Sequence, residues 1–171
     1  MDDWHLVHLG RFAIGGAGIV FTEATAVQKC GRITHGCPGL WADSQIPGHA
    51  RVAQFALRNG AIPAVQLGHA GRKASMQRPW FGNGPLDDAD IARGDMPWTP
   101  VGASAIPVAD GWAVPHALSV ADIQNLVSDY VAATRRAREA GYRIVEIHGA
   151  HGYLVHSFLL PLSNRRSDGY G

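Results

Sequence analysis

The residues best suited to chemistry are two histidines and a tyrosine that directly follow an apolar stretch. His148, His151 and Tyr153 lie within six positions, just after residues 144–147, and glycines separate them. Glycine lets the chain turn sharply and lets a ligand approach the backbone. Imidazole can bind a metal or exchange a proton, and a phenol can act as a general acid. A lone histidine could be a hydrogen-bonded core residue, but three such groups at one strand end predict a functional site.

Composition and charge describe an ordinary globular protein. The 171 residues are 46% hydrophobic and 17% charged, with a formal net charge of +1. That length suits one domain, and the charge gives no electrostatic reason to expect nucleic acid or an anionic membrane as a partner. No stretch approaches the roughly 20 apolar residues of a membrane span, and the acidic start lacks the form of a signal peptide. We therefore expect a cytoplasmic protein that does not contact a membrane.

The two cysteines do not indicate a structural zinc site. Cys30 and Cys37 are seven positions apart, without the tight spacing of zinc ligands. His35 lies between them, but all three side chains come from one loop and no fourth ligand is evident. Reduced thiols are the simpler interpretation, and they agree with a cytoplasmic location.

Helical and strand patterns alternate along the chain. Apolar periodicity, glycine stops and a serine N-cap predict these elements: a helix over 5–13, a strand over 17–23, a helix over 46–59, a strand over 61–67, a helix from 119 to 141, and a strand over 144–147. Residues 74–116 hold many prolines and no helical period, which predicts a functional excursion with local hairpins. Residues 157–171 look like a loop. The alternation predicts a parallel sheet with helices outside it, either a barrel or an open doubly wound sheet.

The position of the polar residues favours the barrel. Each predicted strand carries its polar side chains at its C-terminal end, as the strands of a (β/α)₈ barrel do. A Rossmann sheet needs a glycine-rich fingerprint just after its first strand, whereas Gly15-Gly16-Ala17-Gly18 precedes a strand here. A full barrel takes eight strands and roughly 200–400 residues, and only three strands are evident. We therefore expect a partial TIM barrel with open edges that promote self-association.

Several separated motifs resemble one known family along essentially the whole chain. They are LGRFA at 9–13, TAV at 25–27, GRIT at 31–34, GLW at 39–41, VQLGHAGR at 65–72, EIHGAHGYL at 146–154 and PLSN at 161–164. The sequence resembles the flavin-dependent old yellow enzymes, or ene-reductases, and above all the bacterial branch with a His/His pair and its enoate and dienoyl-CoA reductase relatives. The resemblance implies that residues 1–171 form a single partial TIM-barrel, FMN-binding oxidoreductase domain. It would hold about strands 2–4 of the family barrel, with the excursion after the second strand present.

The family resemblance implies a cofactor and its contacts. FMN would lie at the C-terminal mouth of the barrel, reduced by NADPH or NADH. Ala24 would present its backbone to the isoalloxazine, and Gln66 would hydrogen-bond the flavin pyrimidine ring. A side-chain amide suits that contact because it offers both a donor and an acceptor.

The same resemblance implies the roles of the strand-end residues. His148 and His151 would bind the activating oxygen of an α,β-unsaturated carbonyl, nitro or enoate substrate, with Gly149 and Ala150 completing the substrate site. Two imidazole donors can polarise that oxygen while hydride arrives at Cβ. Tyr153 would then give a proton to Cα. The partner is thus a small molecule.

Two alternatives remain. Relative to the family, the sequence lacks the first strand and the later strands with their phosphate-binding loops, so the chain alone is expected to bind FMN weakly or not at all. It could be an inactive fragment that needs a complementary chain. The more remote alternative is a metal-dependent barrel hydrolase whose ligands would be Glu23, His69, His148 and His151. The sequence lacks a His-Glu-x-x-His motif or a carboxylate among the histidines, so we expect no metal site.

Overall fold

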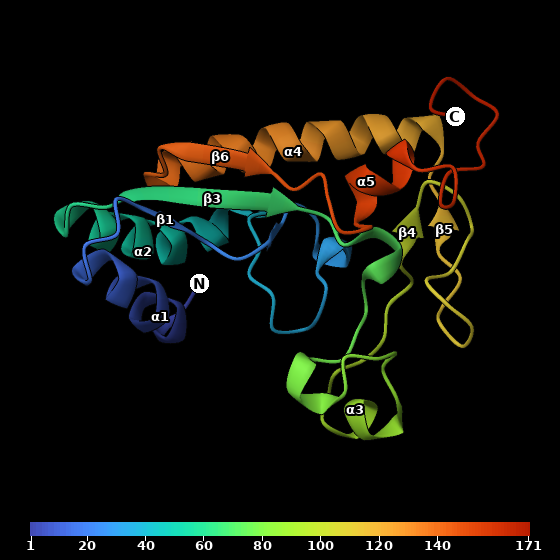
Figure 1. The fold of residues 1–171 in the computed structure, drawn as a ribbon, viewed down its shortest axis with the longest axis horizontal. Coiled ribbons are helices and arrows are strands. Elements are labelled where there is room, and N and C mark those ends of the chain that lie inside the picture. The colour runs from blue at the N-terminus through green and yellow to red at the C-terminus, as the bar shows by residue number, and fades with distance from the viewer.

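A parallel β-sheet forms the centre of the protein. In the computed structural model, which describes all 171 residues, β3 (Ile62–Gly68) is the central strand. It pairs with β1 (Ile19–Phe21) and β2 (Thr25–Ala26) on one side and with β6 (Ile144–Ile147) on the other, always in parallel (Figure 1). The α/β architecture with a parallel sheet, predicted from the alternating pattern, is confirmed.

The first predicted strand is interrupted by a bulge. β1 and β2 both pair with β3, but residues 22–24 between them lie opposite only residues 65–66. One extra residue on one strand is the definition of a β-bulge, a feature that commonly re-aims side chains beside functional sites. The hydroxyl oxygens of Thr22 and Thr25 lie 3.2 Å apart across the bulge and help to close it. The sequence predicted one uninterrupted strand over 17–23, because periodicity does not reveal a single inserted residue.

Three helices cover one face of the sheet: α1 (Asp3–Ile14), α2 (Ile46–Arg58) and α4 (Val120–Ala140). All three were predicted, with ends that differ by a few residues. Ser119 caps α4 by accepting a hydrogen bond from the Asp122 backbone N–H, 3.1 Å away. Gly141 ends the helix in the left-handed conformation, with φ of 99°, which glycine adopts at little cost.

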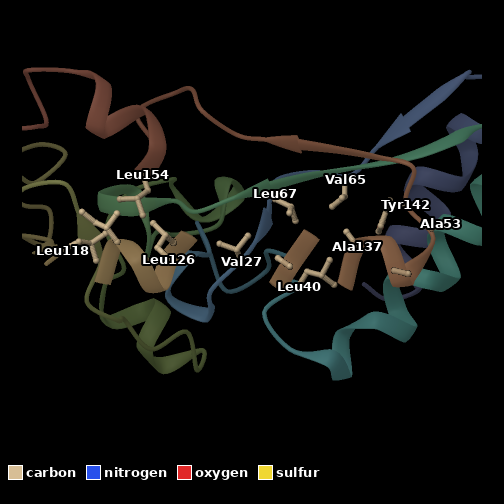
Figure 2. Close-up of a cluster of buried hydrophobic side chains, with 13 residues drawn as sticks. Val27, Leu40, Ala53, Val65, Leu67, Leu118, Leu126, Ala137, Tyr142 and Leu154 are labelled. Carbon is tan, nitrogen blue, oxygen red and sulfur yellow. The ribbon is translucent and has the colours of Figure 1, made fainter. Parts of the chain in front are cut away.

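The main hydrophobic core lies between the sheet and these helices. Val65 and Leu67 point from β3 toward Ala137 of α4 and Ala53 of α2 (Figure 2), and the whole cluster contains 13 buried side chains. Because side chains alternate along a strand, Gln66 points to the opposite face of the sheet. The Gln66 side chain makes an exposed contact there, and the sheet is not closed into a barrel.

The excursion and the end of the chain gather beyond the C-terminal ends of β3 and β6 (Figure 1). The excursion contains a short helix, α3 (Asp88–Ala92), and two short strands, β4 (Val101–Gly102) and β5 (His116–Ala117). The predicted local hairpins are wrong for these strands, since β4 and β5 pair in parallel.

A final helix, α5 (Leu154–Leu159), extends into residues that were predicted to be a loop. It forms because Leu154 is fully buried and its backbone N–H bonds to the carbonyl of His69 at 3.0 Å. This anchoring comes from a residue distant in sequence, so no local pattern indicated it. None of the helices is both long and apolar enough to span a membrane.

Candidate active site

The C-terminal ends of β3 and β6 and the bulge before β2 meet around a small depression. Its wall includes Ala24, Gly68, His69, His148 and Tyr153. A Cβ atom at Gly68 would lie 3.4 Å from the Cβ of His148 and 4.0 Å from that of Ala24, so any larger side chain there would fill the space between them. The structure therefore brings together three of the predicted site residues: His148 and Tyr153 from the end of β6, and Ala24 from the bulge.

His148, His151 and Tyr153 form one cluster of rings. The His148 and His151 ring centroids are 5.2 Å apart, and those of His148 and Tyr153 are 4.9 Å apart, both in edge-to-face geometry. The His148 Nδ1 accepts the Ala150 backbone N–H at 3.2 Å, which leaves the proton on Nε2. That Nε2 lies 3.4 Å from Nδ1 of His151. The His148 N–H therefore points at His151, by a long contact, and the Nε2 of the exposed His151 ring has no protein partner.

The backbone that carries this cluster has an unusual conformation. His151 has φ of 58° and the following Gly152 has φ of 73°, both in the left-handed region. For a residue other than glycine this conformation is uncommon, and it is held by the surrounding structure. Lys73 contributes here, since its Nζ donates to the His151 carbonyl at 2.7 Å and lies 5.8 Å from the Tyr153 ring centre. The sequence analysis missed this lysine, although its place just after the β3 strand end was a usable signal.

Burial sets the protonation of His148 and Tyr153. It is the main cause that lowers the pKa of His148 below its ordinary value, and the neighbouring His151 lowers it further, against a smaller opposing effect of Glu146. Burial also raises the pKa of Tyr153, with Cys37 as a secondary cause. At neutral pH, therefore, His148 is a neutral N–H donor and Tyr153 keeps its phenolic proton.

Gln66 and Glu146 lie side by side on the open face of the sheet. They are directly opposite each other in the β3–β6 pairing, and the Gln66 Nε2 donates to the Glu146 carboxylate at 2.8 Å. Gln66 was a predicted site residue, whereas the contact with Glu146 was not foreseen. The other two predicted residues, Gly149 and Ala150, form the turn between the histidines.

His69 has a different role from the histidines of the cluster. Its Nδ1 accepts the Gly71 backbone N–H at 3.0 Å, and its Nε2 lies 3.0 Å from the side-chain oxygen of Gln28. Gln28 in turn donates to Asp129 of α4 at 2.6 Å. With both ring nitrogens satisfied by protein groups, and a pKa that burial lowers to about 4, His69 is a neutral structural residue.

The ligand set of the hydrolase alternative is not assembled. Glu23 contacts His5, with 3.1 Å between its carboxylate oxygen and the His5 Nε2, and His69 is bonded to Gln28. No three His, Cys, Asp or Glu side chains gather where they could hold a metal ion. The geometry therefore does not support this alternative.

Comparison with known proteins identifies the family. The model of the NADH:flavin oxidoreductase / NADH oxidase family matches residues 1–171. The chain belongs to this family. An NADH:flavin oxidoreductase of Gibberella zeae is 45% identical over 170 residues, which cover 99% of this chain and 41% of that protein. An NADPH dehydrogenase of Listeria innocua is 42% identical over 99% of this chain and 44% of its own length.

Solved structures agree with the sequence relatives. Morphinone reductase superimposes with a TM-score of 0.80 and 30% identity, over 99% of this chain and 45% of that one. An old yellow enzyme from Pichia sp. gives a TM-score of 0.83 with 25% identity, over 100% of this chain and 43% of that one. The predicted resemblance to old yellow enzymes is confirmed, and the chain spans less than half the length of these relatives.

Proposed function

We propose that the chain is part of an FMN-dependent NAD(P)H oxidoreductase, an ene-reductase, that reduces the activated C=C bond of α,β-unsaturated carbonyl, nitro or enoate compounds. Residues 1–171 would be one domain, a partial (β/α)₈ barrel. The observation that carries this proposal is the convergence of His148, His151 and Tyr153 at the end of β6, beside the bulge that holds Ala24.

The residues around the depression are compatible with a flat cofactor. Gly68 has no side chain and Ala24 only a methyl group, so they leave the strand ends open. Gln66 adds a side-chain amide on the same open face of the sheet. These three residues would hold the flavin ring. When bound, FMN supplies hydride to the substrate Cβ after NADPH or NADH has reduced it.

The histidine pair would bind and polarise the substrate. The two rings can direct N–H groups at a carbonyl or nitro oxygen, and such donors stabilise the negative charge that develops there during reduction. Because burial lowers the pKa of His148, this ring donates as a neutral group and keeps its proton.

Tyr153 would be the proton donor to Cα. Its half-buried phenol has a raised pKa, so it remains protonated until it donates its proton to the substrate Cα. The contact of Lys73 with the His151 carbonyl fixes the turn between the substrate-binding histidines and this phenol. Tyr153 is also the N-cap residue of α5, so that helix fixes its backbone.

The decisive experiment compares Tyr153→Phe with wild type in the flavin-loaded protein by stopped-flow absorbance. Loss of a general acid typically slows the assisted step by about 10²- to 10⁴-fold. Reoxidation of the reduced flavin by an enone should slow in that range, while flavin reduction by NADPH stays within about twofold. Tyr170→Phe, at an exposed tyrosine, is the matched control. Equal losses in both half-reactions would exclude Tyr153 as the proton donor.

A second proposal follows from the open edge of the sheet: the chain associates with itself there. Val127, Val131 and Ile147 are 58%, 46% and 49% exposed and line an open groove of about 430 Å³ between α4 and β6. We propose that a second copy covers it, and light scattering after gel filtration should then show a dimer or larger assembly. A monomer that loses added FMN, and retains it with a chain supplying the remaining strands, would support the fragment interpretation instead.

A further inference from the structure

We propose that Glu146 is a positioning residue that fixes the orientation of the Gln66 side-chain amide. This inference rests on the proposed function, because Gln66 is the residue offered to the flavin pyrimidine ring. The two residues face each other across β3 and β6, with a distance of 2.8 Å between the Gln66 Nε2 and a Glu146 carboxylate oxygen.

The chemistry of the pair determines which end of the amide points outward. A carboxylate can only accept hydrogen bonds, whereas an amide has one end that donates and one that accepts. The Gln66 nitrogen must therefore face Glu146, and the Gln66 oxygen is turned away from it. That oxygen accepts no hydrogen bond from any protein group. It is thus available to a ligand N–H, such as the imide N–H of a flavin pyrimidine ring.

The surroundings of the pair support a dedicated role. Glu146 forms no ion pair, so Gln66 is its only side-chain partner. The backbone of Gln66 is held in the central strand, and its N–H donates to the hydroxyl of Thr22 in the bulge at 3.3 Å. With the main chain fixed in this way, the remaining freedom at Gln66 is in the side chain, and Glu146 restricts it.

Glu146 also lies two residues before His148, on the same strand. Its negative charge raises the pKa of His148, against the larger lowering by burial and by His151. One carboxylate therefore acts on both halves of the proposed site, on the amide of the cofactor side and on the imidazole of the substrate side.

The first test needs no cofactor. In the full chain labelled with ¹⁵N, the side-chain NH₂ signals of Gln66, identified from their loss in Gln66→Glu, are followed in wild type and in Glu146→Gln. The substitution makes the partner able to donate as well as accept, so the Gln66 signals should shift and the His148 titration midpoint should fall. Glu139→Gln, on the exposed side of α4, is the matched control. Unchanged Gln66 signals in Glu146→Gln would overturn the proposal.

The second test separates orientation from general stability. Fluorescence titration compares FMN with its N3-methyl derivative, which lacks the imide N–H. The hydrogen bond is exposed, so its effect is modest, and we expect Glu146→Gln to reduce the preference for FMN about three- to tenfold. An equal loss of affinity for both flavins would mean a merely structural role and would contradict the proposal. A wild-type chain that binds neither flavin would support the fragment interpretation given above, while the NH₂ signals would still decide the role of Glu146.

Discussion

A histidine follows the end of each of two neighbouring strands, β3 and β6, and the two histidines differ in their hydrogen bonds. His69 follows the end of β3, and His148 follows the end of β6, so the two histidines lie at the same edge of the parallel sheet. His69 is 2% exposed and both of its ring nitrogens are bonded to the protein. His148 is 8% exposed, and the only partner of its Nε2 is the Nδ1 of another predicted site residue, His151, at 3.4 Å.

This comparison shows what distinguishes a functional histidine from a structural one in this fold. A position at the C-terminal end of a strand is not sufficient, because His69 has it too. The difference lies in the partner of the second nitrogen: for His69 it is a side-chain oxygen of Gln28 at 3.0 Å, and for His148 it is the exposed ring of His151 at 3.4 Å, a long contact that a ligand oxygen can replace. His69 instead supports the site indirectly, since its carbonyl accepts the N–H of Leu154, the residue that follows Tyr153.

The largest expected effect is the pH dependence of stability. Burial lowers the pKa of His69 and of His49 to about 4, below the ordinary value of 6.5. Such groups stay neutral in the folded state. Their contribution to the free energy of unfolding is therefore complete above pH 6.5 and is lost as the pH falls toward 4. At pH 5, each histidine should reduce the free energy of unfolding by about 2 kcal/mol relative to pH 8. Urea unfolding at a series of pH values measures this change.

Two variants test whether His69 causes its share of this pH dependence of stability. His69→Gln should remove about half of it, because one of the two buried imidazoles is gone. His116→Gln, at an exposed histidine, should leave it unchanged. A full pH dependence in His69→Gln would show that this imidazole is protonated without cost in the folded protein, contrary to the comparison.

The second effect compares truncation at the two strand ends. His69→Ala leaves the Gln28 side chain and the Gly71 N–H without their partner in a buried position and opens a cavity, which should cost about 3 kcal/mol. His148→Ala removes the partner of only one N–H, that of Ala150, and should cost about 1 kcal/mol. Urea unfolding at pH 8 measures both. Equal costs would mean that His148 is as much a structural residue as His69.

The smallest effect concerns the backbone of the site. His151 has φ of 58°, a conformation that costs an ordinary residue about 1 kcal/mol more than glycine. His151→Gly should therefore be more stable than His151→Ala by about that amount, in thermal or urea unfolding. If the alanine variant proves the more stable one, the turn is not strained, and the left-handed conformation at the site has no energetic significance.

Much of the fold could be predicted from the sequence, because local patterns determine it. Helix α4 has an N-cap at Ser119 and a glycine stop at Gly141, and the apolar residues of β3 and β6 define strands. The bulge before β2, the parallel pairing of β4 with β5, and α5 could not be predicted. Each depends on hydrogen bonds to residues distant in the sequence, which a local pattern does not contain.

The candidate site divides in the same way. The sequence by itself determined the residue types and spacing of His148, His151 and Tyr153, and hence the family resemblance, because these residues follow one strand end and need only a local turn to come together. Only the tertiary structure decided that His69 is a neutral structural residue with both ring nitrogens hydrogen-bonded, that Lys73 holds the turn, and that Glu146 faces Gln66. The physical reason is that a side chain's role depends on which of its polar atoms the protein already satisfies, and those partners come from other strands and helices.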